Sequence, residues 1–135
     1  MARVPVAWVT AIVLLAEAVG AVLVNGVLAT VVDQQHMSLA GLDVAALSTG
    51  AWVMGGLFGL YLLTCVAILI RTAVQDRAPG RFGGIVLISC AVVHGVLGAV
   101  TVGLVGWAAF AFMMVVLGLL VLVLLAYGRE HTATA

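Results

Sequence analysis

The sequence predicts an all-α integral membrane protein with four transmembrane helices in a compact bundle. Three observations predict this fold: the composition, four long apolar runs and the distribution of the arginines. Hydrophobic residues make up 66% of the 135 residues and charged residues 7%, with a mean hydropathy of +1.38. Because a soluble domain has about 25% charged residues, this chain has too little polar surface to cover one. We expect a single domain over residues 1–135.

Four apolar segments are long enough to cross a bilayer, since about 20 apolar residues span the ~30 Å hydrocarbon core as a helix. Lipid offers the backbone no hydrogen-bond partner, and none of the segments shows the alternating pattern of a membrane barrel. We therefore expect helices over residues 4–32, 44–70, 82–105 and 107–127.

The first helix carries Pro5 in its first turn, where a missing N–H costs little. Its apolar run is too long for a secretory signal and is interrupted by Glu17. We interpret it as a retained membrane helix.

The second and third helices carry small residues at every fourth position. Such ridges let helix backbones approach closely, which matters where lipid gives no hydrophobic drive. We expect them to pack helices together, either within the chain or between copies of it. The ridge residues are Ala51, Gly55 and Gly59 in the second helix and Ala91, Gly95, Ala99 and Gly103 in the third.

The fourth helix has no charged or amide side chain over residues 107–127 and is bulky on nearly every face. It is expected to face lipid or a partner subunit.

Basic residues predict the orientation, because cytoplasmic loops are enriched in Lys and Arg. All five would lie on the cytoplasmic side if both termini did, and the loops 33–43 and 105–107 carry none. The aromatic residues agree, with Trp8 and Tyr127 at the inner boundary. The five basic residues are Arg3, Arg71, Arg77, Arg81 and Arg129.

Two ionisable side chains lie deep in the predicted helices. At 1.5 Å per residue, Glu17 lies ~16 Å and His94 ~18 Å from the inner boundary, with Tyr61 ~14 Å deep. The first and third helices run in the same direction, so Glu17 and His94 are predicted to meet inside the bundle. This polar layer is either a structural hydrogen bond or part of a proton or ion relay, since intramembrane ionisable residues are functional candidates.

The segment LLAEAVG (14–20) resembles the first-helix motif of the small multidrug resistance transporters, and IVLIS (85–89) echoes a stretch found in some of them. The resemblance covers about a tenth of the chain. It implies that Glu17 alternately binds protons and cationic substrates. The long first loop, the second helix and the arginine bias depart from that family. In general appearance the chain looks like small four-helix membrane proteins of high-GC bacteria.

Other chemistry is not predicted. An intramolecular bis-histidine haem needs two core ligands, and His94 is the one histidine in the apolar runs. The sequence contains no CxxC, phosphate loop or zinc spacing. We therefore expect no cofactor, no metal, no nucleic-acid partner and no enzyme activity.

Two functional hypotheses follow for a multi-pass protein of the bacterial inner membrane with both termini cytoplasmic. In the first, it is a small accessory or structural subunit that packs against other membrane subunits through its glycine-rich helix faces. In the second, it is a small homo-oligomeric proton-coupled transporter that uses Glu17. The first is preferred, because one carboxyl and one imidazole without a further polar pathway favour packing over transport.

Overall fold

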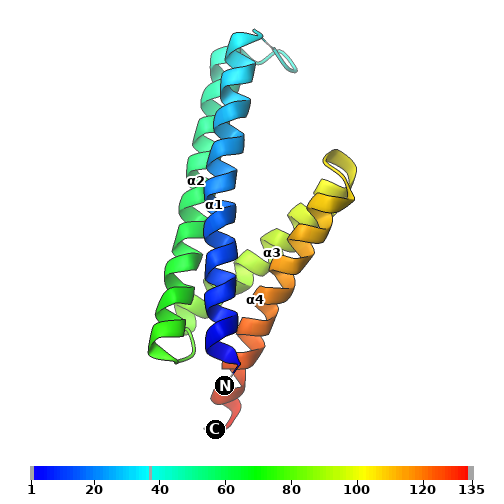
Figure 1. Ribbon diagram of the computed structural model, residues 1–135. Helices are drawn as coiled ribbons and strands as arrows, with labels where there is room; N and C mark the ends of the chain where they lie inside the picture. Colours follow the sequence, from blue (N-terminus) through cyan, green and yellow to red (C-terminus); the bar gives the residue numbers. More distant parts are fainter. Residues whose placement is uncertain (1, 37, 134–135) are drawn as a thin grey trace. The chain divides into compact units, whose positions relative to one another are not determined.

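The computed structural model describes residues 2–36 and 38–133, and side chains as far as Arg129. Its described part is all-helical (Figure 1). The four helices are α1 (Arg3–Gln34), α2 (Val44–Gln75), α3 (Arg81–Leu104) and α4 (Trp107–Ala133). Each is long and apolar enough to cross a membrane. The predicted helical class and the four long apolar helices are confirmed.

The helices differ from the predicted segments mainly at their polar ends. α2 ends at Gln75 instead of near residue 70, and α4 continues to Ala133 instead of residue 127. Both extensions carry arginine and glutamine or glutamate side chains. The sequence-based boundaries followed the apolar runs, whereas a helix satisfies its own backbone hydrogen bonds in water and lipid alike and needs no apolar side chains to continue.

By packing, the chain divides into two compact units. The first, here called the hairpin unit, is Leu15–Thr64. The second, here called the four-segment unit, is Met1–Leu14 together with Cys65–Ala135. α1 and α2 each contribute one part to both units, whereas α3 and α4 belong to the four-segment unit.

In the hairpin unit, α1 and α2 run side by side and antiparallel (Figure 1). Glycines allow this close approach. A Cβ at Gly55 would lie 2.6 Å from Asn25 Cβ, and one at Gly59 would lie 2.7 Å from Val22 Cγ2. Gly26 of α1 packs in the same way under the Trp52 ring, where a Cβ would lie 2.9 Å from the Cη2 atom. Small residues on both helices thus hold the hairpin together.

In the four-segment unit, a core of larger side chains is enclosed by four pieces of helix. α3 and α4 form an antiparallel pair (Figure 1), joined by a turn at Gly106, whose φ of 122° favours glycine. Gly98 of α3 lies directly beneath Met114 of α4. On α4 the buried residues recur at helical spacing, at Val116, Leu120, Val123 and Tyr127. Other fully buried core residues are Ala7, Thr10, Leu14, Cys65, Leu69, Leu87, Cys90 and His94.

Polar side chains along the helices bond to carbonyl oxygens of their own helix. The hydroxyl of Thr10 donates to Val6 O at 2.7 Å and that of Thr64 to Leu60 O at 2.9 Å. The amide of Asn25 donates to Ala21 O at 2.9 Å. This leaves the helix faces apolar in effect, since the polar atoms are already hydrogen-bonded.

Candidate functional site

The predicted polar layer is divided between the two units. Glu17 and Tyr61 lie in the hairpin unit and are both half-buried. The contacts of Gly59 with Val22 and of Gly55 with Asn25 fix the register of α1 against α2. Continued by about one turn toward the start of α1, this pairing of positions places Glu17 within about one turn of Tyr61, measured along the hairpin axis. The two side chains therefore share a level on neighbouring helices.

His94 lies in the four-segment unit and is fully buried. Its Nδ1 is 2.7 Å from Cys90 O and 3.6 Å from Cys90 Sγ. Because a carbonyl oxygen only accepts, Nδ1 carries the proton, and in the neutral ring Nε2 is then the acceptor. The predicted meeting of His94 with Glu17 joins residues of different units and stays a prediction.

Two buried thiols adjoin His94. Cys65 of α2 and Cys90 of α3 are both free, and their side chains lie near each other. Cys90 lies one turn before His94, so the three residues form a buried cluster that connects α2 with α3. Sequence analysis did not connect the cysteines with His94, although the spacing of Cys90 and His94 by four residues placed them on one helix face. Among the described residues, no group of three or more His, Cys, Asp and Glu side chains could hold a metal ion.

The two predicted glycine ridges have different surroundings. Gly55 and Gly59 of α2 are buried against α1. On α3, a Cβ at Gly95 or Gly103 would meet nothing within 4 Å, and Ala99 is exposed. The contact of α3 with α4 uses Gly98 instead, which lies seven residues after Ala91 and therefore on the same stripe as that one ridge residue. The remaining ridge residues are Ala51, which is half-buried, and Ala91, which is buried.

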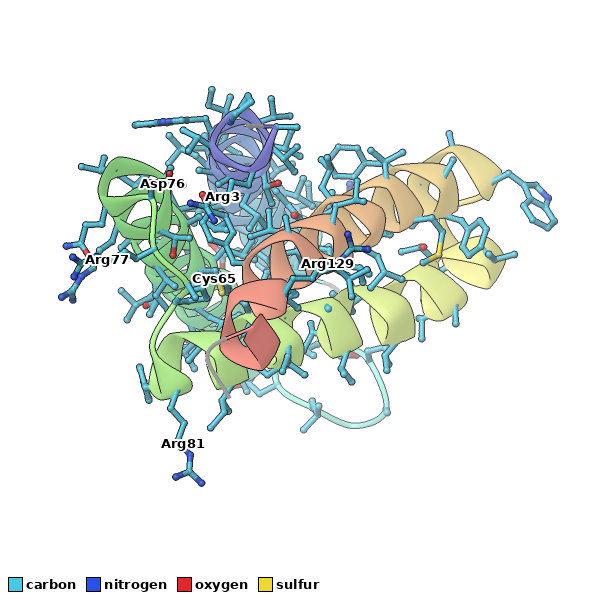
Figure 2. The ribbon with its side chains drawn as sticks, turned by 90° about the horizontal axis from the view of Figure 1, so that it is seen from below. Arg3, Cys65, Asp76, Arg77, Arg81 and Arg129 are labelled. Carbon is cyan, nitrogen blue, oxygen red and sulfur yellow. The ribbon has the colours of Figure 1, made fainter. Side chains whose placement is uncertain are left out.

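A second cluster, which sequence analysis missed, lies at the arginine-rich end of the four-segment unit (Figure 2). Arg3 Nε donates to Asp76 Oδ1 at 2.7 Å and Arg3 Nη2 donates to Asp76 Oδ2 at 3.0 Å. This paired geometry is the strongest form of an arginine–carboxylate contact. The Arg3 guanidinium hydrogen bonds hold the pKa of Asp76 below its ordinary value of 3.8.

Tyr127 completes this cluster. Its ring is fully buried, and Arg3 Cζ lies 5.4 Å from the ring centroid. After Arg3, which has the larger effect, the Tyr127 hydroxyl also helps to lower the pKa of Asp76. The sequence predicted Tyr127 as an interfacial aromatic residue at the inner boundary. In the structure the Tyr127 ring is fully buried, and the Arg3 guanidinium lies over it. The sequence signal for this pair was one positive residue at the start of the first predicted helix and one negative residue just beyond the end of the second.

Asp76 also ends α2. Its φ of 46° lies in the left-handed region, which asparagine and aspartate tolerate better than other residues with side chains. The turn directs its carboxylate to Arg3, so the end of α2 and the beginning of α1 are fastened together.

Comparisons with family models, with curated proteins and with solved structures find no match to this chain.

Proposed function

We propose that this protein is a small accessory or structural subunit of a larger membrane complex of an energy-converting or transport type. It crosses the bacterial inner membrane four times with both termini cytoplasmic and has no catalytic activity of its own. Its shortest helix, α3, has 24 residues and is about 36 Å long, more than the ~30 Å hydrocarbon core. Polar side chains bonded to their own helices make such faces compatible with lipid.

Arginine positions support the orientation. Contacts of Arg3 with Asp76 and Tyr127 bring the start of α1, the end of α2 and the end of α4 to one end of the four-segment unit. All five basic residues lie at or near helix termini of that end. Because positive residues are retained on the cytoplasmic side, this end is the cytoplasmic one in the proposal.

The uncovered ridge of α3 carries the proposal of a packing role. Among the described residues, a Cβ at Gly95 or Gly103 would meet nothing within 4 Å, whereas Gly55 and Gly59 of α2 are in contact with α1. Small residues at four-residue spacing are the surfaces through which membrane helices associate. A helix of another subunit that packs along residues 95–103 would use that room.

Purification of the tagged chain in mild detergent, followed by native mass spectrometry, tests this role. We expect other membrane subunits to copurify in a fixed ratio. Gly95→Leu should abolish copurification, because the side chain fills the room left for the partner. Gly118→Leu is the matched control, since a Cβ at Gly118 of α4 also meets nothing within 4 Å. A chain that purifies alone, or equal losses in both variants, would contradict the proposal.

A second candidate function rests on an observation in the hairpin unit. The hairpin unit has an apolar cavity of about 220 Å³. Its lining residues are Ala18, Val19, Val22, Leu23, Gly59 and Leu63. Glu17 does not line this cavity but precedes its lining residue Ala18 in the sequence, and an apolar cavity on the same helix pair suits a lipophilic cation, as in the proton-coupled transporter hypothesis.

Flux measurements in proteoliposomes separate the two functions. If the chain is a carrier, a pH gradient should drive uptake of a lipophilic cation, Glu17→Gln should abolish it and Glu17→Asp should retain part of it. Wild-type vesicles without proton-coupled uptake would exclude the carrier for the cations tested and leave the subunit role in place.

A further inference from the structure

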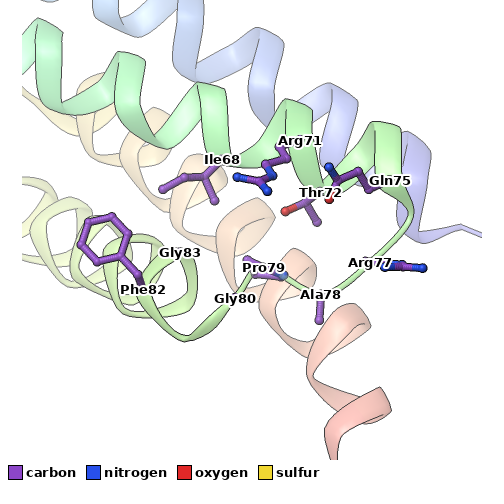
Figure 3. A pocket seen from close by; sticks show the side chains of 10 residues that line it. All are labelled: Ile68, Arg71, Thr72, Gln75, Arg77, Ala78, Pro79, Gly80, Phe82 and Gly83. Atoms are coloured by element: carbon purple, nitrogen blue, oxygen red, sulfur yellow. The ribbon is translucent and has the colours of Figure 1, made fainter.

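A cavity of about 290 Å³ lies between the end of α2 and the start of α3, wholly inside the four-segment unit (Figure 3). Its volume is at the lower end for small-ligand sites. The polar part of its lining comes from Arg71, Thr72, Gln75 and Arg77. Figure 3 shows Arg71, Thr72 and Gln75 of α2 facing the segment that leads into α3.

Thr72 is the unusual member of this lining. Its side chain is only 3% exposed and lines the cavity, and the structure records no hydrogen bond of its hydroxyl to the described residues. Thr10, the other buried threonine of the described residues, donates to a carbonyl of its own helix. The Thr72 hydroxyl can therefore donate to a ligand in the cavity.

The start of α3 contributes backbone donors. Gly80 is the N-cap and offers no side chain to the first turn, and the first backbone bond of the helix is Gly84 N to Gly80 O at 2.8 Å. The N–H groups of Phe82 and Gly83, which line the cavity, therefore have no partner in their own helix. Helix N-termini with free N–H groups favour anions, and phosphate in particular.

The remaining lining is apolar. Ile68 and Pro79 line the cavity, and Phe82 at its edge is 74% exposed. A polar side with two arginines beside an apolar side matches a phosphate group attached to a glycerol ester. In a membrane-spanning protein, this turn between two helices lies at the level of the lipid headgroups.

We propose that the cavity between α2 and α3 is a binding site for a phosphate group, held by Arg71, Thr72 and the first turn of α3. Arg71 and Arg77 supply positive charge, and the Thr72 hydroxyl donates to a phosphate oxygen. The phosphate comes either from the headgroup of an anionic phospholipid or from a soluble phosphate ester. This inference goes beyond the proposed subunit role and does not depend on it.

Isothermal titration of the full chain in a nonionic detergent tests the site with two probes. Dioctanoyl phosphatidylglycerol represents the lipid, and glycerol phosphate represents its headgroup without acyl chains. We expect Arg71→Gln to weaken binding about tenfold or more, because a charge-assisted contact is lost. Thr72→Val should weaken it about threefold or more. Binding of the lipid alone identifies a headgroup site, and binding of both probes identifies a general phosphate site.

Arg81→Gln is the matched control. It removes the same charge from the same loop, but Arg81 does not line the cavity and extends away from the unit in Figure 2. We expect it to change affinity by less than about twofold, as for other exposed charges. Thr72→Val should unfold at the same or a higher temperature than the wild type, since the structure records no hydrogen bond of the hydroxyl to the described residues. Weaker binding by that variant would then result from the lost contact with the ligand and not from a loss of folded protein.

Two results would overturn the proposal. One is the absence of binding of either probe to the wild type at millimolar concentration. The other is an equal loss of affinity in Arg71→Gln, Thr72→Val and Arg81→Gln, which would show diffuse attraction by the basic loop.

Discussion

The hairpin unit and the four-segment unit bury apolar helices by different means. Within the hairpin unit α1 packs against α2, and Gly26, Gly55 and Gly59 let the two backbones approach until side chains of the opposite helix lie over them. In the four-segment unit, leucine and valine fill the space among four pieces of helix, and Arg3, Asp76 and Tyr127 close one end. The stability of the two-helix unit therefore depends on the close approach of its backbones, whereas that of the four-segment unit depends on the volume of the side chains that fill its core.

The largest effect is expected from removing core volume in the four-segment unit. Leu120 of α4 is fully buried, and Leu120→Ala should lower the free energy of unfolding by about 3 kcal/mol, because the space cannot fully collapse. Denaturant titration in detergent micelles measures this change.

Leu122→Ala provides the control, since Leu122 lies two residues away and is 54% exposed. We expect it to be nearly neutral. Equal losses for Leu120→Ala and Leu122→Ala would show that α4 does not bury the face formed by Val116, Leu120 and Val123.

A somewhat smaller effect is expected from adding volume in the hairpin unit. A Cβ at Gly55 meets Asn25 Cβ at 2.6 Å, so Gly55→Val should force the two helices apart. Overpacking of this kind costs about 1–3 kcal/mol. Thermal unfolding followed by circular dichroism is a suitable measurement.

Gly56→Val is matched in helix, chemistry and neighbouring position, but a Cβ at Gly56 meets nothing within 4 Å. It should unfold close to the wild-type temperature. If Gly56→Val were the more damaging variant, the register of α1 against α2 described above would be wrong.

The smallest effect is expected at the exposed end of the four-segment unit, where Asp76 is ion-paired with Arg3. Asp76 has a lowered pKa, so its contribution to stability is present above its ordinary value of 3.8 and is lost as the pH falls through the lower folded-state value. In Asp76→Asn this part of the acid dependence should disappear, and at neutral pH the variant should be slightly less stable than the wild type.

Thermal unfolding between pH 2 and 7, in roughly half-unit steps, checks this sign. Asp33→Asn serves as the control, because Asp33 lies in the hairpin unit and is exposed. Wild type and Asp76→Asn with parallel acid profiles would show that the carboxylate contributes nothing through Arg3.

Composition and apolar run length were sufficient to predict the four helices. Both features follow from the cost of placing charged side chains and unpaired backbone groups in lipid. The packing of Gly55 and Gly59 could be located from spacing, but not which helix they would contact. The ridge on α3 shows the limit of such patterns. Gly95 and Gly103 have the same spacing as the α2 ridge, yet Gly98 is the glycine that α4 covers. Spacing describes one helix face and does not say which face a neighbour occupies.

Individual side-chain contacts were less accessible from sequence. Arg3 counted only toward orientation and Asp76 was not considered, since their separation of 73 residues gives no local pattern. The Cys65 contact with Cys90 likewise joins different helices. The predicted pairing of Glu17 with His94 rests on equal depth in the bilayer, and it stays a prediction. Depth alone leaves rotation about each helix axis undefined.

The Arg3–Asp76 pair has a consequence for biogenesis. Its two partners are synthesised at different times, because Asp76 follows the whole of α1 and α2 in the chain. In a bilayer, both residues reach the same surface only if the second helix has inserted antiparallel to the first. A chain whose second helix failed to insert would leave Arg3 and Asp76 on opposite sides and Tyr127 uncovered. In the proposed membrane orientation, the pair can therefore form only after the first half of the protein has inserted correctly.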